Sequence, residues 1–172
     1  SAASDVYKRQ RLDEEAVMKV ELLMSKAGVS VKDRACVSPA LERAERDKLP
    51  AAAIQLPDGQ VITGGTSSLL GASAAMLLNA LKRLGGIGHD ILLISPIVIE
   101  PIQNLKIKHL GNNNPRLHTD EILIALSISA ATNPEARLAL EQFPKLKGCQ
   151  AHTSVMLSSV LSLIHIWTLP TI

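Results

Sequence analysis

The stretch of sequence that decides the fold is PAAAIQLPDGQVITGG, which occupies residues 50–65. Two apolar runs within it, residues 51–56 and 60–63, have the length and composition of short β-strands. Between them lies Pro57-Asp58-Gly59, and an Asp-Gly pair flanked by such runs is a strong signal for a tight reversal of the chain. The stretch therefore predicts a β-hairpin.

A glycine-rich turn and a long apolar helix are expected directly after the hairpin. Residues 64–68 read GGTSS, and the helix predicted for residues 67–84 is apolar almost all round, which is typical of a buried helix. Its small side chains at 71–75 would allow a neighbouring backbone to approach closely. Further along, the branched apolar run at 91–94 predicts a fully buried strand that lies parallel to a neighbouring strand.

Helical patterns fill most of the remaining chain. The apolar spacing of residues 12–27 is helical, and Gly28 follows as an expected C-terminal cap. Capping residues and apolar runs predict further helices at 39–48, 100–110, 120–131 and 134–142, and a last strand at 149–157. Strands that alternate with helices indicate an α/β domain. We predict a layered sheet with a β-hairpin and buried helices, Rossmann-like in general character and truncated at both ends.

The two ends of the chain do not resemble the sequence between them. Residues 1–10, SAASDVYKRQ, resemble the conceptual translation of a sequencing adapter, and residues 161–172 resemble the translation of its other half. Artificial segments of this kind are set aside before the fold is considered. The predicted organisation is then a helical segment at 11–49, from the preceding part of a longer protein, and an α/β domain fragment at 50–160.

Charge and aromatic content argue against nucleic-acid binding and membrane binding. The chain has 18 Lys and Arg residues against 16 Asp and Glu residues, a formal net charge of +2. This near balance gives no electrostatic basis for binding a nucleic acid or an anionic membrane surface. Phe143 is the only aromatic residue between the two ends, so binding by base stacking is also disfavoured.

Apolar runs and cysteines indicate a soluble cytoplasmic protein. The longest apolar runs, at 69–81 and 122–131, are shorter than the roughly 20 residues that a membrane helix needs. Cys36 and Cys149 are far apart in the sequence, and neither lies at a metal-binding spacing from other ligands. Two reduced cysteines and no metal site are therefore expected.

Seven collinear stretches resemble one bacterial protein family. They are residues 50–59, 66–74, 78–82, 99–102, 114–121, 125–134 and 147–149. The family is known as domain of unknown function 1846, or uncharacterised protein family 0371, and the resemblance extends over residues 11–160. It implies that the chain is a later part of longer, multi-domain, soluble bacterial proteins. It implies neither a particular reaction nor a cofactor.

The first candidate site is the glycine-rich turn, which would bind a ligand through Gly64, Gly65, Thr66, Ser67 and Ser68. A helix that starts at this turn would point free backbone amides and the positive end of its dipole at an anion. Members of the resembling family often have lysine at the position of Gly65, which would complete a string like the end of a P-loop. Gly65 lacks that charge, so an ATPase is disfavoured. The alternative interpretation is a turn with a Ser/Thr helix cap.

The second candidate site lies in the segment NPRLHTDE. Arg116 carries the forked guanidinium that binds carboxylates and phosphates. His118 is a candidate catalytic acid or base, with Asp120 or Glu121 orienting its ring. The alternative interpretation is a helix start, in which Thr119 is the N-cap and the two acids complement the helix dipole. That alternative leaves Arg116 and His118 unexplained. A third, weaker candidate is Ser95 with Glu100, beyond the predicted strand, where a Ser-Pro turn is the alternative.

Two hypotheses of function follow. In the first, the domain binds a small anionic or phosphorylated metabolite between residues 64–68 and the loop of Arg116 and His118, either as an enzyme or as a binding module. In the second, the domain serves packing and homo-oligomer formation. The small residues at 72–75 would then form an inter-domain or subunit surface, and the chemistry would lie in the missing part of the longer protein.

Overall fold

The computed structural model describes residues 2–155, with side chains from residue 15 onward. Two compact units divide between Arg34 and Ala35. The first contains helix α1, Ala2–Ala27, and a short 3-10 turn, η1, Val31–Asp33. The helix predicted at 12–27 lies within α1, and Gly28 follows it with a φ of +68°. Residues 161–172 lie outside the described residues, and the adapter origin of both ends stays a prediction.

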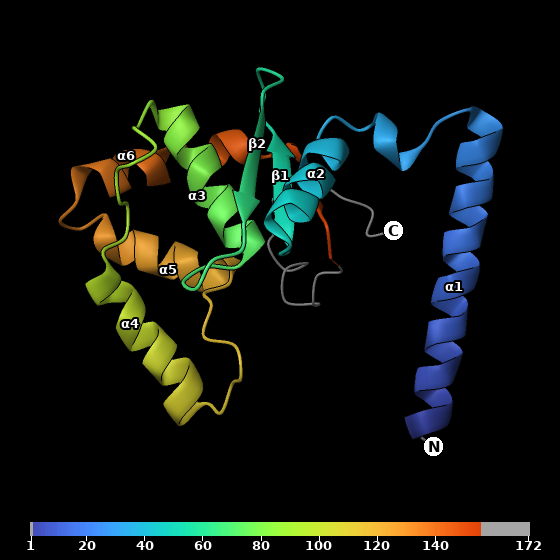
Figure 1. Cartoon of the computed structure of the whole chain (residues 1–172), viewed down its shortest axis with the longest axis horizontal. Helices are drawn as coiled ribbons and strands as arrows, with labels where there is room; N and C mark the ends of the chain where they lie inside the picture. The colour runs from blue at the N-terminus through green and yellow to red at the C-terminus, as the bar shows by residue number, and fades with distance from the viewer. Residues whose placement is uncertain (1, 156–172) are drawn as a thin grey trace. The chain divides into compact units, whose positions relative to one another are not determined.

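The second unit is built around a three-stranded antiparallel sheet in the order β2-β1-β3 (Figure 1). β1, Ala51–Gln55, and β2, Val61–Gly65, form the predicted hairpin. Gly59 in its turn has a φ of +85°, a conformation that glycine adopts without steric cost. β3, Gln150–Thr153, pairs with the other edge of β1 and confirms the described part of the predicted last strand; residues 156–157 lie outside the described residues.

Helices cover both faces of the sheet (Figure 1). Ala53 of β1 packs with Cys36 and Ala40 of α2, Val37–Asp47. Its neighbours on β1, Ala52 and Ile54, belong instead to the main core beneath α3, Ala72–Gly85. Alternate residues of a strand point to opposite faces, so one alanine-rich strand serves both cores.

The main core is formed largely by helices on the α3 side of the sheet. They are α4, Pro96–Asn104, a π-helical turn, η2, Leu105–His109, α5, Thr119–Ser129, α6, Pro134–Glu141, and a 3-10 turn, η3, Phe143–Leu146. The predicted helix at 134–142 is confirmed, because Asn133 Oδ1 accepts the N–H groups of Glu135 and Ala136 at the start of α6. The helix predicted at 120–131 corresponds to α5.

The strand predicted at residues 91–94 is wrong. Leu93 and Ile94 are buried, as predicted, but Ile91 and Leu92 are exposed and the segment has no strand pairing in the described chain. Its carbonyls at Leu92 and Leu93 instead face the Asn133 side chain, 3.4 Å away in each case. An irregular segment that delivers two apolar side chains to a core has the same composition as a short buried strand, so the pattern alone could not separate them.

Three helix starts also differ from the predictions. α2 begins at Val37 rather than at residue 39, and the proline that was expected to open it lies within its first turn. α4 begins at Pro96, where Ser95 Oγ accepts the N–H of Ile97. Ser95 is therefore a helix cap rather than the end of a strand, and Pro101 lies inside the helix that it was expected to open. The third helix whose start differs is α3, which follows the first candidate site and is described with it.

The described residues form a mixed helix and strand fold with a β-hairpin and buried helices. All strand pairs of the sheet in this part of the chain are antiparallel, so the Rossmann-like character is not confirmed. Of the small residues at the start of α3, Ala72 and Ala74 are buried, whereas Ser73 and Ala75 are partly exposed. None of the helices in residues 2–155 combines the length and apolar character needed to cross a membrane.

Candidate functional site

Two loops that lie far apart in the sequence meet at one β-bridge. Leu70 and Leu117 form an isolated parallel bridge. The Leu117 N–H donates to Leu69 O at 2.9 Å, and the Gly71 N–H donates to Leu117 O at 3.1 Å. Leu117 is fully buried, which anchors the second loop to the main core. The bridge therefore brings the first and second candidate sites side by side.

Arg116 makes a direct contact between the two loops. Its Nε–H donates to the backbone carbonyl of Ser67 at 2.7 Å. Its backbone N–H donates to Asn114 Oδ1 at 3.1 Å. Its terminal guanidinium nitrogens, Nη1 and Nη2, make no hydrogen bond within residues 2–155. The half-buried side chain is thus held at its inner nitrogen and keeps its outer donors.

The predicted helix start at Ser67 is wrong. Gly64 and Gly65 are the last two residues of β2, and α3 begins only at Ala72. A Cβ added to Gly64 would lie 2.0 Å from the backbone nitrogen of Met76, so this glycine is where the helix crosses the strand. The glycine is required for close packing of α3 on β2, which is a structural reason for its presence that needs no phosphate.

The turn after β2 pairs the N–H groups of Thr66, Ser67, Leu69 and Leu70 within the protein. Thr66 donates twice to Pro50 O, from its N–H at 3.0 Å and from its hydroxyl at 2.7 Å. Ser67 N–H donates to Leu70 O, and Ser67 Oγ accepts the N–H groups of Leu69 and Leu70 at 3.2 and 3.0 Å. A serine hydroxyl that folds back on following amides is typical of a local turn. These amides are therefore not available to an anion in the described conformation.

Two hydroxyls of this turn remain as donors. Ser68 is exposed, and its carbonyl accepts a hydrogen bond from Gln103 Nε2 at 3.4 Å. The Ser67 hydroxyl accepts two amides and retains its own proton. Ser67 is also the residue that Arg116 contacts. The donors that the two loops leave for a ligand thus include the outer nitrogens of Arg116 and these serine hydroxyls.

His118 is the N-cap residue of α5, one position before the predicted cap. Its N–H donates to Glu121 Oε2 at 2.7 Å, whereas Thr119 is the first helical residue and is buried. Asp120 is exposed, and in the described part of the chain it makes no hydrogen bond or ion pair with the His118 ring. The predicted orientation of His118 by an acid is therefore replaced by another partner, Asn114.

The Asn114 side chain connects the backbone of Arg116 to the ring of His118. Its Oδ1 accepts the Arg116 N–H, so its Nδ2 is the atom that faces His118 Nε2, at 3.4 Å. An amide nitrogen can only donate, and the ring nitrogen must then accept. This assignment places the proton of a neutral His118 ring on Nδ1.

Lys106 is a component of the site that the sequence-based predictions missed. Its Nζ donates to Arg116 O at 2.5 Å and to Glu121 Oε2 at 2.8 Å. Only 4% of its side chain is exposed, and lysine is almost never buried unless it is paired. A signal was present, because Ile102 and Lys106 lie four residues apart on one face of the helix predicted at 100–110, which places a charge beside an apolar position.

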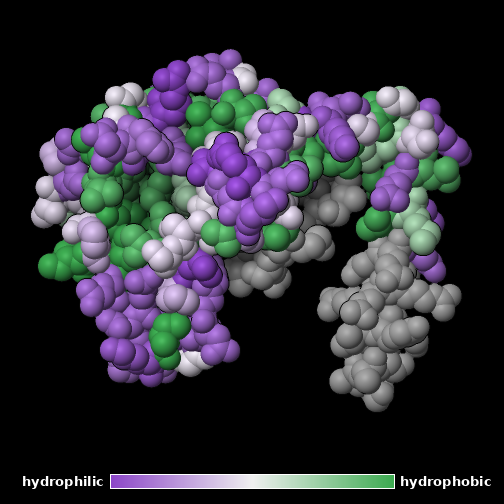
Figure 2. All heavy atoms as spheres, viewed as in Figure 1, coloured by the Kyte–Doolittle hydropathy of each residue, from purple (hydrophilic) through white to green (hydrophobic). Residues whose placement is uncertain are grey.

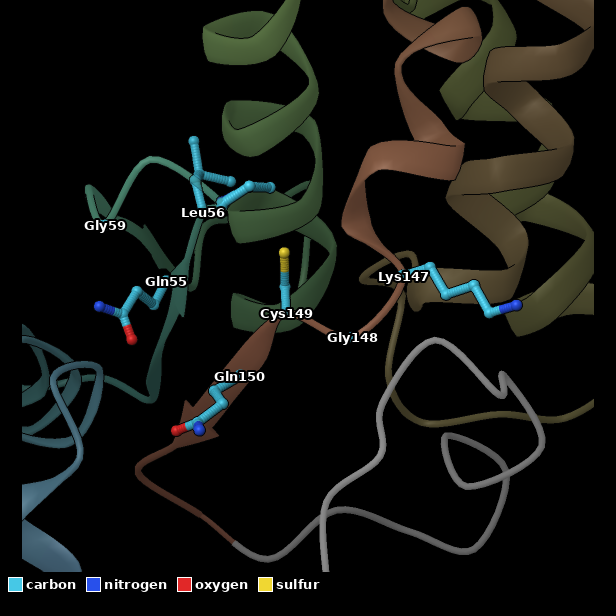
Figure 3. A pocket seen from close by; sticks show the side chains of 8 residues that line it. Gln55, Leu56, Gly59, Lys147, Gly148, Cys149 and Gln150 are labelled. Carbon is cyan, nitrogen blue, oxygen red and sulfur yellow. The ribbon is translucent and has the colours of Figure 1, made fainter.

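A hollow of about 380 Å³ lies apart from the two loops, where β1 ends and β3 begins (Figure 3). It is lined by Gln55, Leu56, Pro57, Gly59, Lys147, Gly148, Cys149 and Gln150. Figure 3 shows the Cys149 thiol pointing toward Leu56 and the Lys147 side chain pointing away from it. Burial raises the pKa of the Cys149 thiol, which keeps it protonated and unreactive at neutral pH. The hollow shares no residue with the two loops.

The chain is similar to a family of bacterial proteins. The family model described as domain of unknown function DUF1846, C-terminal, matches residues 32–164. A UPF0371 protein of Corynebacterium efficiens is 56% identical over 153 residues, which is 89% of this chain and 31% of the relative. A UPF0371 protein of Streptococcus pyogenes serotype M5 is 49% identical over 152 residues, 88% of this chain and 31% of the relative. The chain therefore spans a little under a third of the length of these curated relatives.

Proposed function

This chain belongs to the DUF1846 family, and on that premise we propose that it binds a small anionic ligand at Arg116. The observation that carries the proposal is the 2.7 Å hydrogen bond from Arg116 Nε to Ser67 O. A guanidinium that is held at Nε loses less freedom when its two outer nitrogens engage a carboxylate or phosphate. A phosphorylated metabolite is the ligand class that fits a forked cation beside serine hydroxyls.

The local charges support an anion rather than a cation. Lys106 and Glu121 form an ion pair at 2.8 Å and cancel each other. Arg116 is then the one full charge in the loop at 114–118, because the remaining residues there are neutral when His118 is unprotonated.

The residues proposed to touch the ligand are fewer than those predicted from the sequence. Arg116, Ser67 and Ser68 retain free donors, whereas Gly64, Gly65 and Thr66 form the frame through strand pairing and the bonds to Pro50. His118 is kept as the candidate acid or base, because its ring is exposed within the same loop. Asp120 is kept only as an exposed neighbouring charge, and catalysis by either residue stays a prediction.

An anion titration of the chain tests this proposal, with inorganic phosphate as the probe. Arg116→Ala should weaken phosphate binding at least ~10-fold, which corresponds to about 1.4 kcal/mol. Arg83→Ala is a matched control, because Arg83 is also held by its Nε, at 2.8 Å from Gln60 Oε1, but lies on α3. Equal loss of affinity in the two variants would show that phosphate binds through general surface charge, and the proposal would be wrong.

A second candidate function is assembly, and exposed apolar side chains favour it. Ile97, Leu110, Ile124 and Ile128 are between 60% and 78% exposed. Ile124 and Ile128 lie four residues apart on α5 and so share one face. Figure 2 shows hydrophobic residues at the surface among hydrophilic ones. In relatives about three times as long, such a face would pack against another part of the polypeptide or against a second copy.

Sedimentation at increasing concentration separates the two occupants of the α5 face. A second copy predicts concentration-dependent dimers that Ile124→Lys and Ile128→Lys abolish. A monomer at every concentration would leave another part of the longer protein as the occupant of this face.

Three broader predictions belong to the same proposal. A Rossmann-like arrangement would need parallel strands from parts of the longer relatives that this chain does not span. A cytoplasmic location is supported by Cys36 and Cys149, which are not joined in a disulfide bond. The absence of a nucleic-acid partner is supported by the near balance of charge.

A further inference from the structure

Among residues 15–155, whose side chains the structure describes, Lys106 is the only charged residue that is buried. A buried ammonium group is costly unless hydrogen bonds and an opposite charge compensate for the water that it loses. Lys106 Nζ has both, in the carbonyl of Arg116 and the carboxylate of Glu121. The two partners lie at the start of α5 and in the loop before it, so the lysine ties η2 to the candidate site.

The ion pair holds the Arg116 loop at two points. Lys106 Nζ holds the Arg116 carbonyl at 2.5 Å. The Glu121 oxygen that accepts from Lys106 also accepts the His118 N–H, at 2.7 Å. Between these two points, Leu117 is held from the other side by its bridge to Leu70. The backbone that carries the Arg116 side chain is therefore restrained on both sides.

The π-helical turn contributes to this arrangement. Leu110 N–H donates to Leu105 O, which is the i to i+5 bond of a π-helix, and Asn112 N–H donates to Lys106 O at 2.9 Å. Leu105 is 49% exposed, whereas Lys106 beside it is 3% exposed. The turn thus points a lysine inward while a leucine faces outward, the reverse of what solvation favours. π-Turns of this kind are frequent at functional sites.

We infer that Lys106 and Glu121 are positioning residues that aim the Arg116 side chain at Ser67 and so preorganise the anion site. The inference rests on the proposed function and deepens it, because it names the buried ion pair on which ligand binding by Arg116 depends. Without the ion pair, the loop loses its restraint at Arg116 O and at His118 N, and the 2.7 Å bond from Arg116 Nε to Ser67 O is lost with it.

The direct test is the NMR signal of the Arg116 Nε–H, which a hydrogen bond to a carbonyl protects from exchange with solvent. Lys106→Met keeps the length of the side chain and removes its charge. It should accelerate exchange at Arg116 Nε at least fivefold and leave Arg83 Nε unchanged. Glu121→Gln is a second variant, which keeps an oxygen for the His118 N–H; it should give an effect of the same direction if Lys106→Met does not fold.

Phosphate affinity, measured well below the unfolding temperature, completes the test. Both variants should bind inorganic phosphate at least fivefold more weakly than the parent chain. Asn133→Ala controls for a general loss of stability, since it removes the cap of α6 and should not alter affinity. Unchanged exchange at Arg116 Nε in folded variants would overturn the inference. Altered exchange, together with phosphate binding that Arg116→Ala does not weaken, would uphold the positioning role and overturn the proposed function.

Discussion

Gly64 lies directly against the backbone of Met76, so close that a Cβ on the glycine would be 2.0 Å from the Met76 nitrogen and 2.4 Å from its Cα. The third close atom is the carbonyl oxygen of Ala72, at 2.6 Å. All three belong to the backbone of α3, which cannot yield as the end of a flexible side chain would. The contact fixes how deeply the helix settles on β2.

Gly64→Ala should therefore be strongly destabilising. The added methyl group must push the backbone of α3 off the strand, and we expect a loss of about 3 kcal/mol or more in the free energy of unfolding. Gly65→Ala is the matched control in the same strand, because the nearest neighbours of its added Cβ are side-chain rather than backbone atoms, those of Asp47 and Arg43 at 3.0 and 3.1 Å. Chemical denaturation of both variants measures the difference, and equal losses would contradict this account.

Thr119→Val should stabilise the protein. The Thr119 hydroxyl oxygen is buried and has no hydrogen-bond partner in the described part of the chain. Replacement by the isosteric valine removes the cost of an unsatisfied group, about 1 kcal/mol. Thr66→Val should have the opposite effect of similar size, because the Thr66 hydroxyl donates to Pro50 O at 2.7 Å. The denaturant midpoints of the two variants show whether each change raises or lowers stability. A destabilising Thr119→Val would indicate that the hydroxyl has a partner in solution.

Asp47 should make the protein less stable in acid. The hydrogen bond from Arg43, and then that from Arg46, holds the pKa of the Asp47 carboxyl below its usual value of 3.8. A carboxyl whose pKa is lower in the folded state contributes stability above its unfolded pKa, and this contribution is lost as the pH falls through the folded pKa. Asp47→Asn should remove that part of the pH dependence.

The measurement for Asp47 is the denaturant midpoint as the pH falls from about 6 to about 2, the range over which such carboxyls protonate. Asp47→Asn should reduce the midpoint at the upper end and converge with the parent chain at the lower end. Glu42→Gln, an exposed acid on the same helix, serves as the control and should leave the slope unchanged. A parallel shift at every pH would mean that Asp47 acts through packing alone.

The local parts of the fold could be predicted because local chemistry determines them. The Asp-Gly turn, with Gly59 at positive φ, produced the hairpin as expected. Asn133-Pro134 produced a helix N-terminus whose cap bonds are made by Asn133 itself. Each of these signals acts within a few residues, so no distant contact can reverse it easily.

Three of the wrong predictions depend on contacts between distant segments. Residues 91–94 have the composition of a strand but no neighbouring strand in the described chain with which to pair. The start of α3 was misplaced because the strand register carries β2 through Gly65, and that register is set by pairing with Ala51. The parallel sheet was inferred from the alternation of strands and helices, which does not determine strand direction.

The candidate site was predicted in part. The sequence chemistry identified Arg116 and the serines of the turn, and the structure brings Arg116 to Ser67. The sequence could not show whether the amides of the turn are free, because their hydrogen-bond partners depend on how the turn folds. Lys106 was missed because its role requires the Arg116 carbonyl and the Glu121 carboxylate, which lie 10 and 15 residues away along the chain.

The position of β3 has a consequence for how the protein is made. The hydrogen bond from Ala51 N–H to Ser154 Oγ joins residues 103 positions apart, and β3 pairs along the same side of β1. On a ribosome, the hairpin emerges and can close long before that second neighbour is synthesised. During this interval one edge of an alanine-rich strand is open to other nascent chains. Translation speed and chaperone access should therefore influence the yield of this protein.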